Sequence, residues 1–246
     1  MQLVFVTALV VGGATLLGAG LGFAFRRIPG ALSDGVMAVS AGVMLAAAIL
    51  GLVLPSLSYG GRFSLPVTIG GIFAGAFTIH RMEALLPRLQ RLAGLTRKEQ
   101  LAPGADSALL FVAAIILHKL PEGLAAGVGF GTDNPTDALL IAGGIALQNI
   151  PEGMVVIVPM LTSGVSVGRA LACSLVTALV EMARTLIGYW AVTLVSPILP
   201  LALAFAGGTM LFVLVGQMLP QARGAGNCYA VLAGFCLMLL CDGLLG

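Results

Sequence analysis

Two short segments of the chain share a pattern that joins metal-binding side chains to a helix-interrupting proline. Residues 117–123 read LHKLPEG and residues 147–153 read LQNIPEG, an internal repeat at an offset of 30 residues. Imidazole nitrogen and carboxylate oxygen suit zinc and similar first-row divalent ions, and an amide oxygen is a weaker addition. A set of nitrogen and oxygen ligands without a thiolate is expected to bind such an ion moderately and to release it again.

The spacing within each motif predicts how these side chains lie on a helix. Residues four positions apart share one face of an α-helix, so we expect His118 beside Glu122 and Gln148 beside Glu152. If the two helices pack against each other, the four side chains converge on one ion. The proline of each motif cannot donate a backbone hydrogen bond, and we expect a kink just before each glutamate.

The composition of the chain indicates that these motifs lie within a membrane. Apolar residues make up 59% of the 246 residues and charged residues only 9%, whereas a soluble domain carries about a quarter charged residues. The 34 glycines fit a bundle of membrane helices, because small residues allow helices to approach each other closely. A β-barrel would need alternating strands of about ten residues, and the apolar runs here are longer and do not alternate.

The apolar runs predict an all-α integral membrane protein with eight transmembrane helices in a single domain, residues 1–246. A transmembrane helix needs about 20 apolar residues. The predicted spans are roughly 2–25, 31–57, 65–86, 106–131, 136–160, 168–194, 197–219 and 225–245. The connections are short, apart from a loop of about 88–105 between the third and fourth spans.

The distribution of basic residues predicts that the N- and C-termini both lie outside. Cytoplasmic connections of membrane proteins carry an excess of lysine and arginine. With the N-terminus outside, the outer connections hold only Arg62. The inner connections and helix ends hold Arg26, Arg27, Arg81, Arg88, Arg91, Arg97, Lys98, Arg169 and Arg223. The loop of about 88–105 is therefore expected in the cytoplasm.

Several charged side chains are predicted within the spans, where each costs about 2.5–3.5 kcal/mol on insertion scales. They are Lys119, Glu122, Glu152, Glu181 and Arg184. Because the fourth and fifth spans run in opposite directions, two motifs at matching depth indicate a local two-fold axis in the membrane plane. Inverted repeats around a site at the membrane midplane are a recurring transporter design. We therefore expect the cluster to serve transport.

These residues resemble the ZIP (Zrt/Irt-like) metal transporters, which carry related Pro-Glu-Gly motifs in their fourth and fifth helices. The likeness covers essentially the whole chain, and the leading glutamine of the second motif is similar to the GufA-like branch. The resemblance implies a ZIP-like bundle of eight helices, with helices four and five forming the metal site and an elevator-like movement. It implies a primary metal site at His118, Glu122, Gln148 and Glu152. It implies an adjacent second site that includes Asn149 and Glu181.

The chain departs from the family pattern at Lys119, where relatives usually have asparagine. An ammonium group has only hydrogen-bond donors and cannot ligate a metal while protonated. We predict that Lys119 replaces the second metal ion and leaves a mononuclear site. The cytoplasmic loop also lacks histidine, and residues 216–220 read GQMLP without an acidic residue, so we expect neither a metal-sensing loop nor an obvious inner exit site.

The sequence therefore predicts a transporter that moves a divalent cation into the cytoplasm by alternating access. Zinc is favoured, and iron, manganese, cobalt and cadmium are plausible cargoes. We expect no prosthetic group, no enzymatic activity and no nucleic-acid partner. The lipid bilayer is the surrounding partner, with the inner (cell) membrane of a bacterium as the expected location. The oligomeric state stays open, with a homodimer as one option.

Two other functions stay open from the residues. A proton-coupled carrier of another solute would use Lys119 and the glutamates as a proton relay. An intramembrane metal-dependent hydrolase is disfavoured, because the chain has no HExxH motif and no serine or cysteine beside a base in the two motifs.

Overall fold

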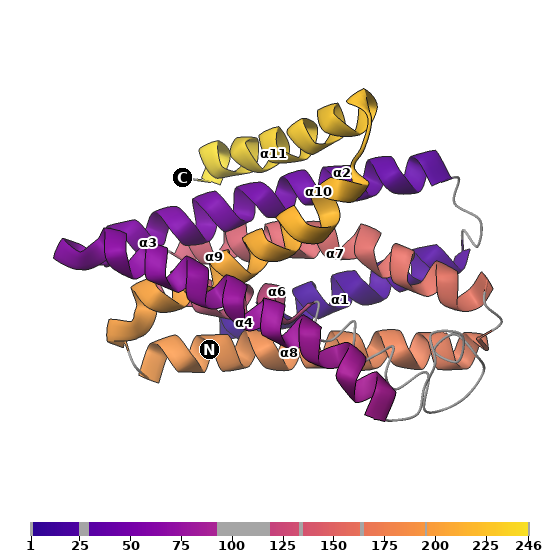
Figure 1. The fold of residues 1–246 in the computed structure, drawn as a ribbon, viewed down its shortest axis with the longest axis horizontal. Helices are drawn as coiled ribbons and strands as arrows, with labels where there is room; N and C mark the ends of the chain where they lie inside the picture. The colour runs from indigo at the N-terminus through magenta and orange to yellow at the C-terminus, as the bar shows by residue number, and fades with distance from the viewer. Residues whose placement is uncertain are drawn as a thin grey trace.

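The computed structural model describes residues 2–24, 30–92, 119–132, 135–162, 165–194 and 196–245. Within these ranges every regular element is helical (Figure 1). The elements are α1 (Gln2–Ala24), α2 (Gly30–Ala46), the π-helix η1 (Ala47–Val53), α3 (Leu54–Tyr59), the 3-10 helix η2 (Gly61–Phe63), α4 (Ser64–Leu92), α6 (Leu120–Val128), η4 (Gly129–Gly131), α7 (Pro135–Thr162), α8 (Val167–Leu194), η5 (Ser196–Ile198), α9 (Leu199–Val213), the π-helix η6 (Leu214–Met218), α10 (Leu219–Gln221) and α11 (Ala225–Leu245).

Six helical segments in the described ranges are long and apolar enough to cross a membrane. They are Gln2–Ala24, Asp34–Tyr59, Gly61–Leu85, Val167–Leu194, Leu199–Met218 and Ala225–Leu244. They coincide with six of the predicted spans, which confirms a multi-pass helical membrane protein. The predicted fifth span coincides in position with the 28-residue helix α7, and the fourth is described only from Lys119 onward. The total of eight spans, the loop of about 88–105 and the outside termini stay predictions.

Long helices suit this sequence because the hydrocarbon core of a membrane offers no water to the backbone. Each N–H and C=O group must therefore find its partner within the helix. Tight turns separate successive helices where glycine allows a left-handed backbone. Gly61, with φ of 56°, follows α3, and Gly224, with φ of 94°, precedes α11. Positive φ is readily adopted only by glycine.

The helices divide into two groups by their packing. In the first group α1, α6, α7 and α8 pack against one another, and we call it the motif group because α6 and α7 carry the repeat. The second group contains α2, α3, α4, α9 and α11, with η1 packed on α9 (Figure 1). A buried apolar core that includes Val11, Met44, Ile145 and Leu203 joins the two groups.

The motif group is held together by glycines at its closest helix contacts. A Cβ atom at Gly153 of α7 would lie 2.5 Å from the carbonyl oxygen of Thr15 in α1, and one at Gly18 would lie 2.1 Å from that of Ile150. A Cβ at Gly127 of α6 would lie 2.1 Å from the carbonyl oxygen of Thr185 in α8. These positions have no room for a side chain, so the close approach of these helices requires glycine there.

Candidate metal centre

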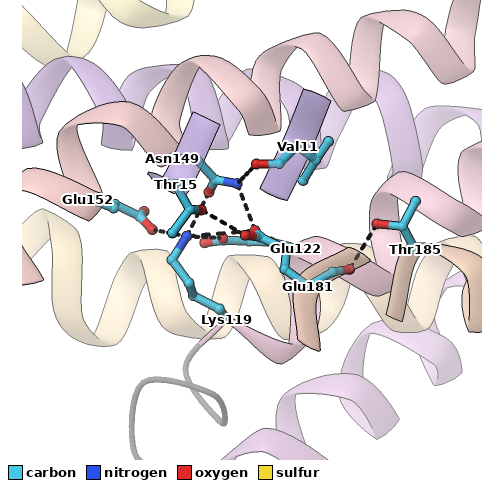
Figure 2. Close-up of polar contacts among 8 residues, drawn as sticks. All are labelled: Val11, Thr15, Lys119, Glu122, Asn149, Glu152, Glu181 and Thr185. Atoms are coloured by element: carbon cyan, nitrogen blue, oxygen red, sulfur yellow. Dashed lines mark hydrogen bonds and ion pairs between the residues drawn. The ribbon is translucent and has the colours of Figure 1, made fainter. Parts of the chain in front are cut away.

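The side chain of Lys119 lies at the centre of a buried cluster of acidic groups (Figure 2). Its Nζ atom lies 3.3 Å from Glu122 Oε2, 3.2 Å from Glu152 Oε2 and 3.6 Å from Glu181 Oε1. It also donates a hydrogen bond of 2.7 Å to Asn149 Oδ1. An ammonium group has three N–H donors, one for each of its three nearest acceptors, which belong to Asn149, Glu152 and Glu122.

Further hydrogen bonds hold the amide of Asn149 and the carboxylate of Glu181 in place. The Nδ2 atom of Asn149 donates to Glu181 Oε1 at 2.7 Å and to the backbone carbonyl of Val11 at 3.2 Å. The hydroxyl of Thr15 donates to Glu181 Oε2 at 2.7 Å. Figure 2 shows how α1 closes one side of the cluster through Val11 and Thr15. The carboxylate of Glu181 therefore has a partner for each of its two oxygens.

The start of α6 and the course of α7 place the two motifs beside each other. Lys119 immediately precedes α6, with φ of −84° and ψ of 3°, and Pro121 lies in the first turn of that helix. Glu122 therefore lies in the first turn of α6, three residues after the non-helical backbone of Lys119. Pro151 of the second motif lies within the single α-helix α7, and the kinks predicted before the two glutamates stay predictions.

The cluster is sealed from solvent. Lys119 and Glu122 are each 2% exposed and Glu181 is fully buried, whereas Glu152 retains 8% exposure. Three carboxylates and one ammonium carry a net charge of −2 when all are ionised. Charges in such surroundings interact far more strongly than in water, so the carboxylates favour a positive charge close to them.

The structure brings together five of the seven predicted site residues: Lys119, Glu122, Asn149, Glu152 and Glu181. His118 lies outside the described residues, so its predicted place beside Glu122 stays a prediction. Gln148 is fully buried, but neither atom of its amide has a hydrogen-bond partner. Gln148 therefore makes no hydrogen bond to either motif glutamate, and its predicted place in the metal site stays a prediction.

No group of three histidine, cysteine, aspartate or glutamate side chains in the described ranges is arranged to hold a metal ion directly. The position of Lys119 explains this, because the ammonium nitrogen contacts the carboxylates that would otherwise surround such an ion. The acidic side chains of the cluster therefore surround the ammonium group of Lys119.

Comparisons with known proteins identify the family of the chain. The family described as ZIP Zinc transporter matches residues 80–242, which include both motifs. The chain is 36% identical over 189 residues to zinc transporter GufA of Myxococcus xanthus, covering 75% of this chain and 72% of that protein. The chain belongs to the ZIP family.

Two further relatives cover nearly the whole chain. Zinc transporter ZIPB of Bordetella bronchiseptica is 31% identical over 252 residues, covering 96% of this chain and 81% of that protein. Zinc transporter ZIP11 of Xenopus tropicalis is 29% identical over 322 residues, covering 97% of this chain and 96% of that protein. ZIP membership supports divalent metal transport across a membrane and places the chain among transporters, not enzymes.

Two residues of this ZIP-family chain contact the cluster but were not predicted from the sequence. Thr15 and the Val11 carbonyl belong to α1. Apolar residues lie on all sides of this helix, so its sequence gives no sign of a polar contact. Thr15 does lie on the buried face of α1 with Val11 and Gly18, and this small and polar stripe was the available signal. Arg184, predicted from the sequence among the charged residues of the spans, is 7% exposed and forms no ion pair within 4.0 Å with an acidic group among the described residues.

Proposed function

We propose that the chain carries a divalent metal ion, zinc first, into the cytoplasm by alternating access, through a mononuclear site at mid-membrane depth. The observation that supports it most is the buried cluster of three carboxylates around one ammonium. Its net charge of −2 is what one divalent ion would balance. The names of the relatives favour zinc, and a bacterial cell membrane is the proposed location.

The primary ligands in this proposal are His118, Glu122, Gln148 and Glu152. The carboxylates of Glu122 and Glu152 contact the same lysine nitrogen, so a small side-chain movement would bring both to one ion. Gln148 and Glu152 are close in angular position on α7. Counting 100° per residue, Gln148 lies about 40° from Glu152 on one side and Asn149 about 60° on the other. Glu152 can therefore turn to either neighbour.

Lys119 takes the place of a second metal ion in this proposal. The carboxylates of Glu122 and Glu181 and the amide of Asn149 come from three different helices and meet at its nitrogen. A second divalent ion there would face an adjacent ammonium at close range. The repulsion between these charges favours one transported ion per cycle.

Release of the ion follows from the ligand chemistry. Metal and protons compete for carboxylates and imidazole, so the glutamates can take up protons as the ion leaves. The two groups of helices offer a mechanical basis for alternating access, because the cluster belongs to the motif group and the other group borders it.

Metal uptake into proteoliposomes tests the proposal. Intact protein is compared with Glu122→Ala and with Glu83→Ala, a carboxylate outside the cluster that accepts a hydrogen bond from Gln217. We expect zinc uptake to fall at least tenfold in Glu122→Ala and to stay near the intact level in Glu83→Ala. Equal uptake by the intact protein and Glu122→Ala would rule out the proposed site.

A proton-coupled carrier of another solute is the second candidate, because the lysine–glutamate cluster is also suited to proton transfer. Replacing Lys119 with asparagine separates the two functions. A metal transporter keeps metal uptake in Lys119→Asn and gains room for a second ion, which equilibrium dialysis with zinc would count. Loss of all zinc binding in this variant would contradict the role given to Lys119.

A further inference from the structure

One buried cation next to the lysine cluster takes no part in its contacts. Arg184 of α8 is buried, and among the described residues its guanidinium has no acidic group within 4.0 Å. A charge inside a membrane protein is costly and is almost always paired. Arginine keeps its positive charge in proteins, so it cannot avoid this cost by losing a proton. The cost is offset if the guanidinium meets a carboxylate in another conformation.

Arg184 is placed close to two carboxylates of the cluster, those of Glu122 and Glu181. It follows Glu181 by three residues, so both side chains lie on the buried face of α8. Its stem packs on Gly123, the residue after Glu122. A Cβ atom at Gly123 would lie 2.8 Å from the Cβ and 3.5 Å from the Cδ of Arg184. The guanidinium interacts electrostatically with both carboxylates, which themselves contact Lys119 (Figure 2).

The two carboxylates differ in how much of their hydrogen-bonding capacity is used. One oxygen of Glu181 accepts a hydrogen bond from Thr15 and the other accepts one from Asn149. The contacts described for Glu122 involve only its Oε2 atom, which accepts from Lys119. Glu122 is therefore the carboxylate with an oxygen left for a further donor.

We propose that Arg184 is a tethered competitor of the transported ion. Its guanidinium pairs with Glu122 when the ion leaves, and an incoming ion displaces it. This inference rests on the proposed function, because it takes Glu122 as a ligand of the transported ion. A planar guanidinium suits the task, since it can bind a carboxylate through two parallel hydrogen bonds. Lys119 has a different part, because its nitrogen already contacts three carboxylates.

The charges of the site explain what such a competitor contributes. Three carboxylates together with Lys119 and Arg184 carry a net charge of −1 when all are ionised, and one divalent ion turns this into +1. Buried like charges repel each other strongly, so the arginine weakens the hold of the site on the ion. After the ion has left, the same arginine compensates a carboxylate that would otherwise be unpaired. Arg184 therefore favours release of the ion and lowers the cost of the empty site.

Zinc transport in proteoliposomes separates the step that needs an empty site from the step that does not. Net uptake into zinc-free vesicles requires the empty site to return across the membrane. Exchange of labelled zinc outside for unlabelled zinc inside does not, because the site crosses with an ion bound each time. We expect Arg184→Gln to lower net uptake at saturating zinc at least fivefold more than it lowers exchange. Zinc binding, measured by equilibrium dialysis, is expected to become at least fivefold tighter.

Two further variants serve as controls. Arg169→Gln removes an exposed arginine from the same helix and is expected to leave net uptake, exchange and zinc binding unchanged. Arg184→Lys keeps a tethered cation at the same place. It is expected to restore at least half of the ratio of net uptake to exchange, and failure to restore any of it would contradict a role for the charge.

Other results for Arg184→Gln would overturn the inference. Equal losses of net uptake and exchange would mean that the arginine only supports the structure. Unchanged or weaker zinc binding would mean that the guanidinium does not compete with the ion. If Glu122→Ala abolishes uptake while Arg184→Gln behaves like the intact protein, only the tethered competitor is wrong. If Glu122→Ala transports normally, the proposed function itself fails, whatever the result at Arg184.

Discussion

At the scale of single residues, the Lys119 ammonium balances charges that come from three helices. Glu122, Glu152 and Glu181 lie within 3.6 Å of its nitrogen and are almost fully buried. Removing one partner of a buried ion pair leaves the other charge uncompensated. The lysine is therefore expected to matter for stability as well as for the number of ions bound.

Lys119→Met removes the ammonium while keeping a side chain of similar length. We expect it to destabilise the protein by about 3–5 kcal/mol, since three buried carboxylates lose their shared cation. Zinc is expected to recover part of this loss by binding where the nitrogen was. Thermal unfolding in detergent, with a chelator and then with zinc, measures both effects. Arg62→Met, at an exposed residue, is the control, and equal unfolding temperatures for the two variants would contradict the prediction.

Thr15→Val tests the contribution of α1 to the cluster. Valine keeps the shape of threonine but cannot donate the 2.7 Å hydrogen bond to Glu181. Hydrogen bonds to charged groups contribute about 1.5–3 kcal/mol, so we expect a clear loss of thermal stability and a fall in zinc uptake. Thr7→Val is the matched control, because Thr7 is buried on the same helix and makes no described contact with the cluster. Identical behaviour of both variants would mean that Glu181 does not need this donor.

At the scale of helices, the repeat motifs are placed by glycines that admit a neighbouring backbone. Gly153 belongs to the second motif and touches α1, whereas Gly143 lies ten residues earlier on the same helix in open space. The two glycines differ only in what surrounds them, so they form a natural pair for comparison.

Gly153→Ala is expected to be destabilising and Gly143→Ala neutral. The added methyl at residue 153 would lie 2.5 Å from the Thr15 carbonyl oxygen, whereas nothing lies within 4 Å of one at residue 143. Forcing extra atoms into a packed contact costs about 1–3 kcal/mol. Unfolding temperature and the fraction of monodisperse protein on gel filtration check the result. A stable Gly153→Ala variant would show that α1 and α7 can separate at no cost.

Much of this helical arrangement was predictable, because apolar length and motif spacing are local properties of the sequence. The clustering of Lys119 with Glu122, Asn149, Glu152 and Glu181 follows from two motifs on packed helices and a third helix carrying an acid. The orientation of Gln148 was not predictable, because Glu152 can turn toward either of two neighbours and only the surrounding packing decides. The contribution of α1 was equally hidden, since a carbonyl group such as that of Val11 has no sequence signature.

At the scale of the whole molecule, alternating access requires the motif group to move relative to the other helices. Gly51 of η1 and Ile141 of α7 lie at the boundary between the groups, with 3.6 Å between the Cβ atom that residue 51 would have and that of Ile141. Disulfides form between residues whose Cβ atoms are about 3.5–4.5 Å apart. A cross-link at this boundary would therefore tie the groups together.

Gly51→Cys combined with Ile141→Cys, in a background without other cysteines, is expected to stop zinc uptake on oxidation. Uptake should fall at least tenfold and return after reduction, because the disulfide prevents relative movement. Leu52→Cys with Gly207→Cys is the control, since these residues lie within one group with a Cβ separation of 3.4 Å. Full uptake by the oxidised boundary pair would argue that the two groups do not move apart during transport.

The participation of α1 also sets an order of events during synthesis. Thr15 and Glu181 are 166 residues apart, and Val11 and Asn149 are 138 apart. A ribosome adding about 5–20 residues per second needs roughly ten to thirty seconds to cover the longer of these distances. During that interval α1 is in the membrane without its partners, and the later carboxylates enter before the cluster is complete. We therefore expect this chain to depend on the insertion machinery to shelter its first helix until α8 has emerged.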